Sequence, residues 1–204
     1  MRTLLTAAAA ALALTGTAAA APAVSFIIDG DTFNEPFTLS NESTDGERIV
    51  RFFIDLDGTG LVFDTVTGGV PNTTAGVPFG AANGTGPLVG LVSGDVVDGG
   101  STLDILFDDF DAGETFSFDI DVDRADGSPT VIGNDLIGAS AFIDLANGQR
   151  LLGTFLAIAG RPQASGFAIT AIIDNPVPVP AAAPLFASAM AGLTWARRRK
   201  KAKA

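Results

Sequence analysis

Short apolar runs separated by turn residues constrain the fold of this chain most strongly. Between Val24 and Ile173, apolar and polar residues alternate over short stretches, and clusters of Gly, Asn, Asp and Pro separate these stretches. A two-residue period is typical of a strand with one buried face. No segment of this region has an apolar period of 3.6 residues over three helical turns. The sequence therefore predicts an all-β domain.

The expected strands are short and numerous. Residues 68–101 are rich in glycine and weakly patterned, so we expect a long surface loop there with at most one strand, at 88–92. Roughly eight to ten short strands at this spacing predict an antiparallel two-sheet β-sandwich, Ig-like or jelly-roll in style. The other strands are expected at 24–28, 47–56, 61–63, 102–107, 114–122, 136–145, 151–158 and 165–173.

Residues 1–20 predict a signal peptide. Arg2 is the only charged residue, and a leucine- and alanine-rich run follows it. This run is shorter than the roughly 20 apolar residues that a spanning helix needs. Ala18 and Ala20 supply the small-x-small pattern of a signal peptidase site. We expect cleavage after Ala20, because cleavage one residue later would place Pro22 first in the mature chain.

A second segment with its own pattern occupies residues 175–204. Its alternating prolines favour extended polyproline geometry and end the domain. Residues 181–196 carry no charge, and as a helix they would rise about 24 Å, slightly less than the ~30 Å hydrocarbon core of a membrane. A basic cluster follows, which predicts a stop-transfer signal held on the cytoplasmic side. Its residues are Arg197, Arg198, Arg199, Lys200 and Lys201.

This order of proline motif, short apolar helix and arginine cluster resembles the PEP-CTERM class of bacterial sorting signals. The variant that it is similar to has the motif Val-Pro-Leu-Pro-Ala, and here Val replaces Leu at position 179. The resemblance implies recognition by a membrane-embedded exosortase of a Gram-negative bacterium and removal of the tail. It also implies a precursor that is tethered transiently to the inner membrane and then delivered to the cell surface or extracellular matrix. The matching residues are Val177, Pro178, Val179, Pro180 and Ala181.

Other kinds of tail fit these residues less well. A permanent single-span anchor needs only the helix and the basic stop, so it stays an alternative. A glycosylphosphatidylinositol signal should end in its hydrophobic stretch, and six of the residues 197–204 are instead basic. A sortase motif of the Leu-Pro-x-Thr-Gly kind is absent from the sequence.

The composition excludes most catalytic chemistry. The chain has no Cys, His or Tyr, so it has no thiolate nucleophile, no imidazole base and none of the usual zinc ligands. Every lysine lies between Lys200 and Lys203, outside the expected β domain. Paired carboxylates remain, but the aromatic platforms that bind sugars are nearly missing, because the single Trp is Trp195. We therefore expect no enzyme, and a secreted hydrolase that uses carboxylates is the least favoured reading.

The β domain is strongly acidic. It contains five arginines and all 23 acidic residues of the chain, which lie between Asp29 and Asp174, so its formal net charge is −18. Such a domain is repelled by nucleic acid phosphates, so we expect no nucleic acid partner. The alternation of residues 116–123 places Phe116, Phe118, Ile120 and Val122 on the core face and three carboxylates on the other. The three carboxylates are Asp119, Asp121 and Asp123.

These three aspartates have two readings. They form either a solvated acidic face that keeps an exported protein soluble or part of a calcium site, since calcium binds six to eight oxygen ligands. An EF-hand loop is excluded, because Arg124 replaces the required Gly and no Glu closes the loop. No other cofactor is expected.

The sequence predicts three regions and one broad function. Residues 1–20 are a signal peptide, 21–174 a β-sandwich domain, and 175–204 the proline motif, single transmembrane helix and basic tail. We expect an exported surface or matrix protein with a structural or adhesive role, as found in biofilms. The alternative is a calcium-dependent module that binds matrix polysaccharide.

Overall fold

A computed structural model describes residues 23–44, 46–71, 75–128 and 130–174 of the 204-residue chain. The predicted signal peptide and its cleavage site lie outside these residues. So do the predicted sorting motif, transmembrane helix and basic cluster. Among the described residues, no helix is long and apolar enough to span a membrane.

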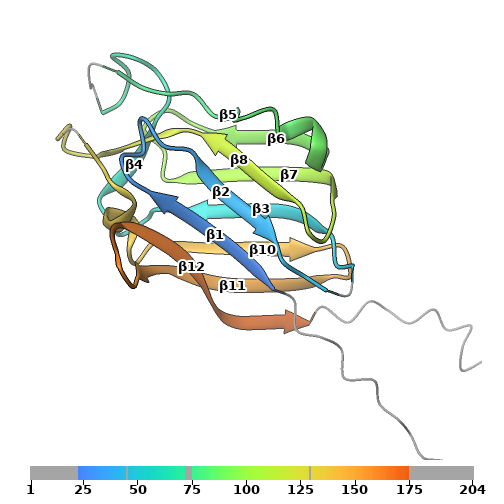
Figure 1. Ribbon diagram of the computed structural model, residues 1–204. Helices are drawn as coiled ribbons and strands as arrows, with labels where there is room; N and C mark the ends of the chain where they lie inside the picture. Colours follow the sequence, from blue (N-terminus) through green and yellow to red (C-terminus); the bar gives the residue numbers. More distant parts are fainter. Residues whose placement is uncertain (1–22, 45, 72–74, 129, 175–204) are drawn as a thin grey trace, which may run out of the picture.

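The described chain is all-β, which confirms the fold class predicted from the two-residue period. Ten antiparallel strands form one sheet in the order β5-β8-β2-β1-β12-β11-β10-β3-β7-β6, and β4 pairs with β9 in a small second sheet (Figure 1). Two 3₁₀ turns, η1 and η2, interrupt the strands. The elements are β1 (Val24–Asp29), β2 (Phe37–Asn41), β3 (Ile49–Asp55), β4 (Leu61–Asp64), β5 (Gly80–Ala81), η1 (Gly86–Val89), β6 (Leu91–Val96), β7 (Thr102–Phe110), β8 (Thr115–Asp119), β9 (Asp121–Arg124), η2 (Gly133–Leu136), β10 (Ser140–Leu145), β11 (Gln149–Ile158) and β12 (Arg161–Asp174).

The large sheet curls until its two edges approach each other, so it nearly closes into a barrel. The ring of Phe79, just before β5, lies so close to Gly94 of β6 that a Cβ on Gly94 would be 2.1 Å from it. Register shifts in the β3–β7, β6–β7, β10–β3 and β11–β12 pairs add to the twist that this curvature needs.

The inside of the curled sheet holds the hydrophobic core. Phe26 lies near its centre and contacts the rings of Phe37, Phe52, Phe118 and Phe155 at centroid distances of 4.7 to 6.2 Å. The core also includes Phe63 and Val122 of the small sheet, both fully buried. One hydrophobic cluster therefore joins the two sheets.

The arrangement differs from the predicted Ig-like or jelly-roll sandwich of two facing sheets. Hydrogen bonding continues from strand to strand through ten strands, and only β4 and β9 stand apart. Alternation in the sequence says which face of a strand is buried, but it does not say which strands are partners. A sandwich and a curled sheet bury the same residues, so the pattern does not separate them.

Several strand boundaries also differ from the prediction. Strand β2 was not expected, and the predicted strand at 88–92 is instead the turn η1 followed by β6. The single strand expected at 114–122 is broken at Ile120 into β8 and β9, which belong to different sheets. This break decides the surroundings of the candidate calcium ligands.

Candidate metal centre

Three aspartates share one face of the small sheet. Strands β4 and β9 are antiparallel, and Asp64 lies directly opposite Asp121. Asp123 is two residues further along β9, so it projects from the same face as Asp121. Phe63 and Val122 project from the opposite face into the core. The register therefore brings three like charges together, an arrangement that destabilises an antiparallel pair unless another group compensates it.

All three carboxylates are buried. The relative exposure of Asp64, Asp121 and Asp123 is 0, 3 and 5%, and one carboxylate oxygen from each lies within 4.8 Å of the others. Ionised carboxylates are costly to bury, and a proton or a cation reduces that cost. Among the described residues, this is the group of acidic side chains whose geometry could hold a metal ion.

Two segments cover this acidic face. The hydroxyl of Thr32 donates toward Asp121 Oδ1 at 3.4 Å and lies 3.1 Å from the carbonyl oxygens of Val122 and Val131. On the other side, the backbone N–H of Val77 donates to the Asp64 carbonyl, and the N–H of Asp121 donates to the Val77 carbonyl. The backbone passes very close at Gly76, where a Cβ would lie 2.4 Å from Asp64 Oδ1. A glycine is therefore required beside the carboxylate.

The loop that follows Asp64 is held by a fourth aspartate. Asp98 accepts hydrogen bonds from the backbone N–H groups of Thr65, Val66 and Val70 at 2.8 to 3.1 Å, and from the Thr65 hydroxyl at 3.2 Å. These donors, the Val70 N–H first, lower the pKa of Asp98. Asp98 thus stays ionised and fixes the start of the loop next to the carboxylate cluster.

Burial and neighbouring negative charge change the pKa of Asp121. Its pKa is raised to about 7, first by desolvation and then by the negative charge of Asp123. The five arginines of the domain form ion pairs with other carboxylates. These pairs are Arg48 with Asp109 and Asp111, Arg51 with Asp104, Arg124 with Asp135, Arg150 with Asp144, and Arg161 with Asp29.

The cluster only partly matches the aspartates proposed from the sequence. Asp121 and Asp123 belong to it, but Asp119 is exposed at the end of β8, opposite Gly80 of β5. The prediction that all three share one face is therefore wrong, because the chain changes sheets at Ile120. Residues 116, 118, 120 and 122 do face the core, as predicted.

Asp64 was not among the candidates chosen from the sequence. It ends an apolar strand, Leu61-Val62-Phe63, and nothing local marks it as a ligand. The available signal was its position at the end of an apolar strand. Its partnership with β9 spans more than fifty residues and becomes visible only in the fold.

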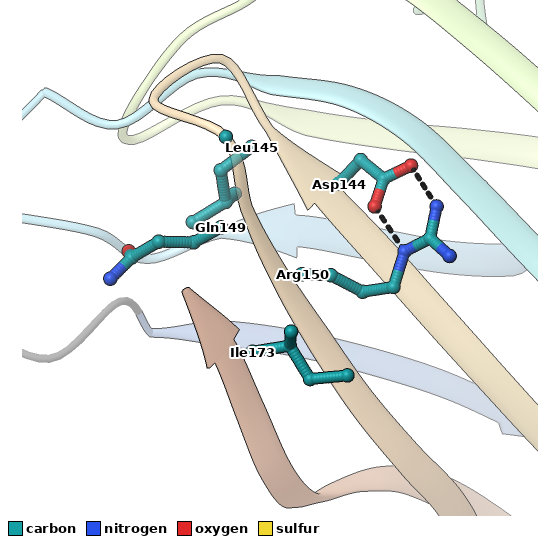
Figure 2. Close-up of a pocket in the computed structure, with 6 residues that line it drawn as sticks. Asp144, Leu145, Gln149, Arg150 and Ile173 are labelled. Atoms are coloured by element: carbon teal, nitrogen blue, oxygen red, sulfur yellow. Dashed lines mark hydrogen bonds and ion pairs between the residues drawn. The ribbon is translucent and has the colours of Figure 1, made fainter. Parts of the chain in front are cut away.

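A second feature lies on the outer face of the large sheet. A hollow of about 460 Å³ opens beside the β10–β11 hairpin and the end of β12 (Figure 2). Asp144 and Arg150, directly opposite each other, form a bidentate ion pair at its rim, with N–O distances of 2.6 and 2.8 Å. The rest of its wall is formed by Leu145, Gly148, Gln149 and Ile173.

Next to this hollow, Phe53 and Phe142 stack across β3 and β10 at a centroid distance of 4.8 Å. The Arg150 guanidinium lies 3.9 Å from the Phe142 centroid, and that of Arg51 lies 5.0 Å from it. These contacts make the two rings part of a cross-strand ladder rather than an open aromatic platform.

The two features differ in chemistry. Three carboxylates that approach from two strands offer the hard oxygen ligands that calcium prefers. The outer ladder is neutralised by its own ion pairs and offers a shallow, mixed surface.

Comparisons of this chain with protein-family models, with curated proteins and with solved structures found no match.

Proposed function

We propose that this protein is exported and acts at the cell surface or in the extracellular matrix in a structural or adhesive role. The observation that carries the proposal is the pair of flanking segments, residues 1–20 and 175–204, whose patterns favour export and exosortase-type sorting. The core cluster of the described residues runs from Val24 to Phe167, so both expected processing positions lie outside it. The domain is thus suited to lose both segments and keep its core.

The sorting step accounts for the tail. In the precursor, residues 181–196 form a temporary transmembrane helix, and the basic cluster from Arg197 holds the end of the chain in the cytoplasm. An exosortase-like enzyme recognises Val177 to Ala181 and removes the tail. A permanent anchor would instead leave residues 181–204 attached to the exported domain.

The geometry favours a calcium ion within this exported domain. Asp64, Asp121 and Asp123 are buried together, and a divalent cation would offset the charge that their register concentrates. Backbone carbonyls from the covering segments or water would supply the remaining ligands. Such an ion would have a structural role, because it would join β4 to β9 and the covering loop to both.

Two other functions have less support. A calcium-dependent module for matrix polysaccharide would need an open aromatic surface, whereas the Phe53–Phe142 pair is packed against arginines. The hollow beside Arg150 is where a sugar would then bind. A hydrolase that uses carboxylates would need room for a sugar beside its acids, and the three clustered aspartates are almost fully buried.

Mass spectrometry of the protein isolated from its native host tests the proposal. We expect an N-terminus at Ala21, a chain that ends near the proline motif, and, under native conditions, the added mass of one calcium ion. Replacing Pro178 and Pro180 with Ala should leave a longer, membrane-retained form. Intact residues 1–20 on the exported protein, or unchanged release of the double variant, would contradict the sorting proposal. A native mass equal to that of the bare chain would contradict the calcium proposal alone.

A further inference from the structure

One part of the large sheet has an open edge. Strand β12 has 14 residues, and β11 pairs with it as far as Asp174, but on its other side β1 pairs only with residues 164–166. Residues 167–174 therefore have one edge without a described strand partner, and we call this segment the free edge. In Figure 1 the arrow of β12 runs out beside β11 at the lower side of the sheet.

The free edge is apolar and exposed. Ile169, Ile172 and Ile173 have relative exposures of 37, 44 and 47%. Ile169 pairs with Gly153 and Ile172 with Leu151, two residues whose positions are buried, so both isoleucines project from the core face of the sheet. No charged residue occurs from 162 to 173. Backbone donors and acceptors and apolar side chains are thus displayed together.

The other edges of the sheet are protected. Strand β6 carries Asp95 and a register shift after Leu91, and Phe79 covers its Gly94. Strand β5 is two residues long. Charges, bulges, covering groups and short length are the usual devices that prevent edge-to-edge pairing. Along residues 167–173 the free edge of β12 carries no charge and no described covering group. Its one register shift, at Thr170, leaves Ile169 and Ile172 on either side available for pairing.

We propose that the free edge pairs antiparallel with the free edge of a second copy of this chain. A strand edge is complementary to itself across a two-fold axis, because each residue i of one copy meets residue j of the other and the reverse. With the axis perpendicular to the sheet, Ile169 and Ile172 of each copy lie on the same face and contact those of the other. The sheet then continues from one subunit into the next.

The distribution of charge favours this edge as the place where two copies meet. With five arginines against 23 acidic residues, two copies repel each other over most of their surfaces. Residues 162–173 form the long uncharged stretch of β12. When the two free edges pair antiparallel, Asp174 of one copy lies beside the uncharged Phe167 end of the other, so this edge allows close approach without facing carboxylates.

Cysteine cross-linking tests the pairing on the exported protein from its native host. The chain has no cysteine, so any disulfide dimer must form through the introduced residue. Thr170→Cys, Ala171→Cys and Ile172→Cys are made one at a time, with Val92→Cys on β6 as the control, since Val92 is also exposed, at 59%. Paired antiparallel residues have Cα atoms about 4.5 to 5.5 Å apart, within disulfide range. At least one free-edge variant should cross-link under mild oxidation and the control should not. No cross-link at all three positions, or equal cross-linking at Val92, overturns the proposal.

Sedimentation gives an independent readout without oxidation. The parent should dimerise, and Ile172→Lys should raise the dimer dissociation constant at least about tenfold, because it removes buried apolar area and adds a charge to a paired edge. Val92→Lys should change it less than about twofold. A parent that stays monomeric at its highest soluble concentration overturns the proposal. A monomer whose residues 167–174 resist hydrogen exchange also overturns it, because the chain itself would then cover the edge.

Discussion

At the scale of single residues, the buried aspartates are the feature that most needs an explanation. Asp64 and Asp121 face each other across two strands, and Asp123 is their neighbour on the same face. In a protein whose arginines pair with other carboxylates, this register concentrates negative charge where water is excluded. Protons or a cation would each lower the cost of this charge. Compensation by protons and compensation by a cation have opposite dependence on pH, so measurements at several pH values separate the two.

The metal-free protein should become less stable as pH rises. Asp121 has a folded pKa of about 7, above the unfolded value of about 3.9, so the folded state binds more protons between these limits. Its contribution is fully present below pH ~4 and is lost as pH rises through ~7, with a slope of at most about 1.4 kcal/mol per pH unit.

Urea unfolding from pH 5 to 8 in the presence of a chelator measures this slope. Asp121→Asn should flatten it. Asp119→Asn, which removes the same charge at an exposed position, should keep most of it. Equal slopes in both variants would mean that general charge repulsion, and not the buried carboxylate, sets the pH dependence.

At the scale of strands and loops, the sequence predicted which face of a strand is buried better than it predicted which strands pair. It correctly placed residues 116, 118, 120 and 122 against the core, but it did not show that β9 leaves the large sheet to pair with β4. That pairing buries the second face of β9 under the segment around Gly76, so Asp121 and Asp123 are covered and Asp119 is not. Local alternation cannot predict this, because the covering segments are distant in the sequence.

Asp98 should be necessary for the loop that covers the site. Its carboxylate accepts three backbone N–H groups, and Asp98→Ala would leave these donors without their acceptor. We expect a loss of about 1–3 kcal/mol in the free energy of unfolding. Asp95→Ala, at an exposed position of β6, should change it by less than about 0.5 kcal/mol. Denaturant unfolding of the two variants compares them, and an equally small effect of both would refute this role for Asp98.

At the scale of the whole molecule, one resemblance within the sequence has a structural meaning. The phrases Phe53-Ile54-Asp55-Leu56 and Phe142-Ile143-Asp144-Leu145 are similar, and their strands turn out to be direct neighbours, with Phe53 opposite Phe142. Both phrases have the same alternation because both face the same core with Ile and the same outer ladder with Phe. The sequence suggested similar strand chemistry, but the adjacency of the two strands and the near closure of the sheet depend on pairings that no local pattern contains.

Calcium-dependent thermal stability tests whether the buried aspartates bind calcium. A ligand that binds only the folded state stabilises it by ~2.7 kcal/mol at a hundred times Kd, which raises Tm by several degrees for a chain of this size. The parent, Asp64→Asn and Asp119→Asn are melted in CaCl₂, and in MgCl₂ and NaCl at matched ionic strength. We expect a rise in Tm that is specific to calcium, that Asp64→Asn largely removes and that Asp119→Asn retains. Equal rises in all three salts, or an undiminished calcium effect in Asp64→Asn, would contradict a calcium site formed by the buried aspartates.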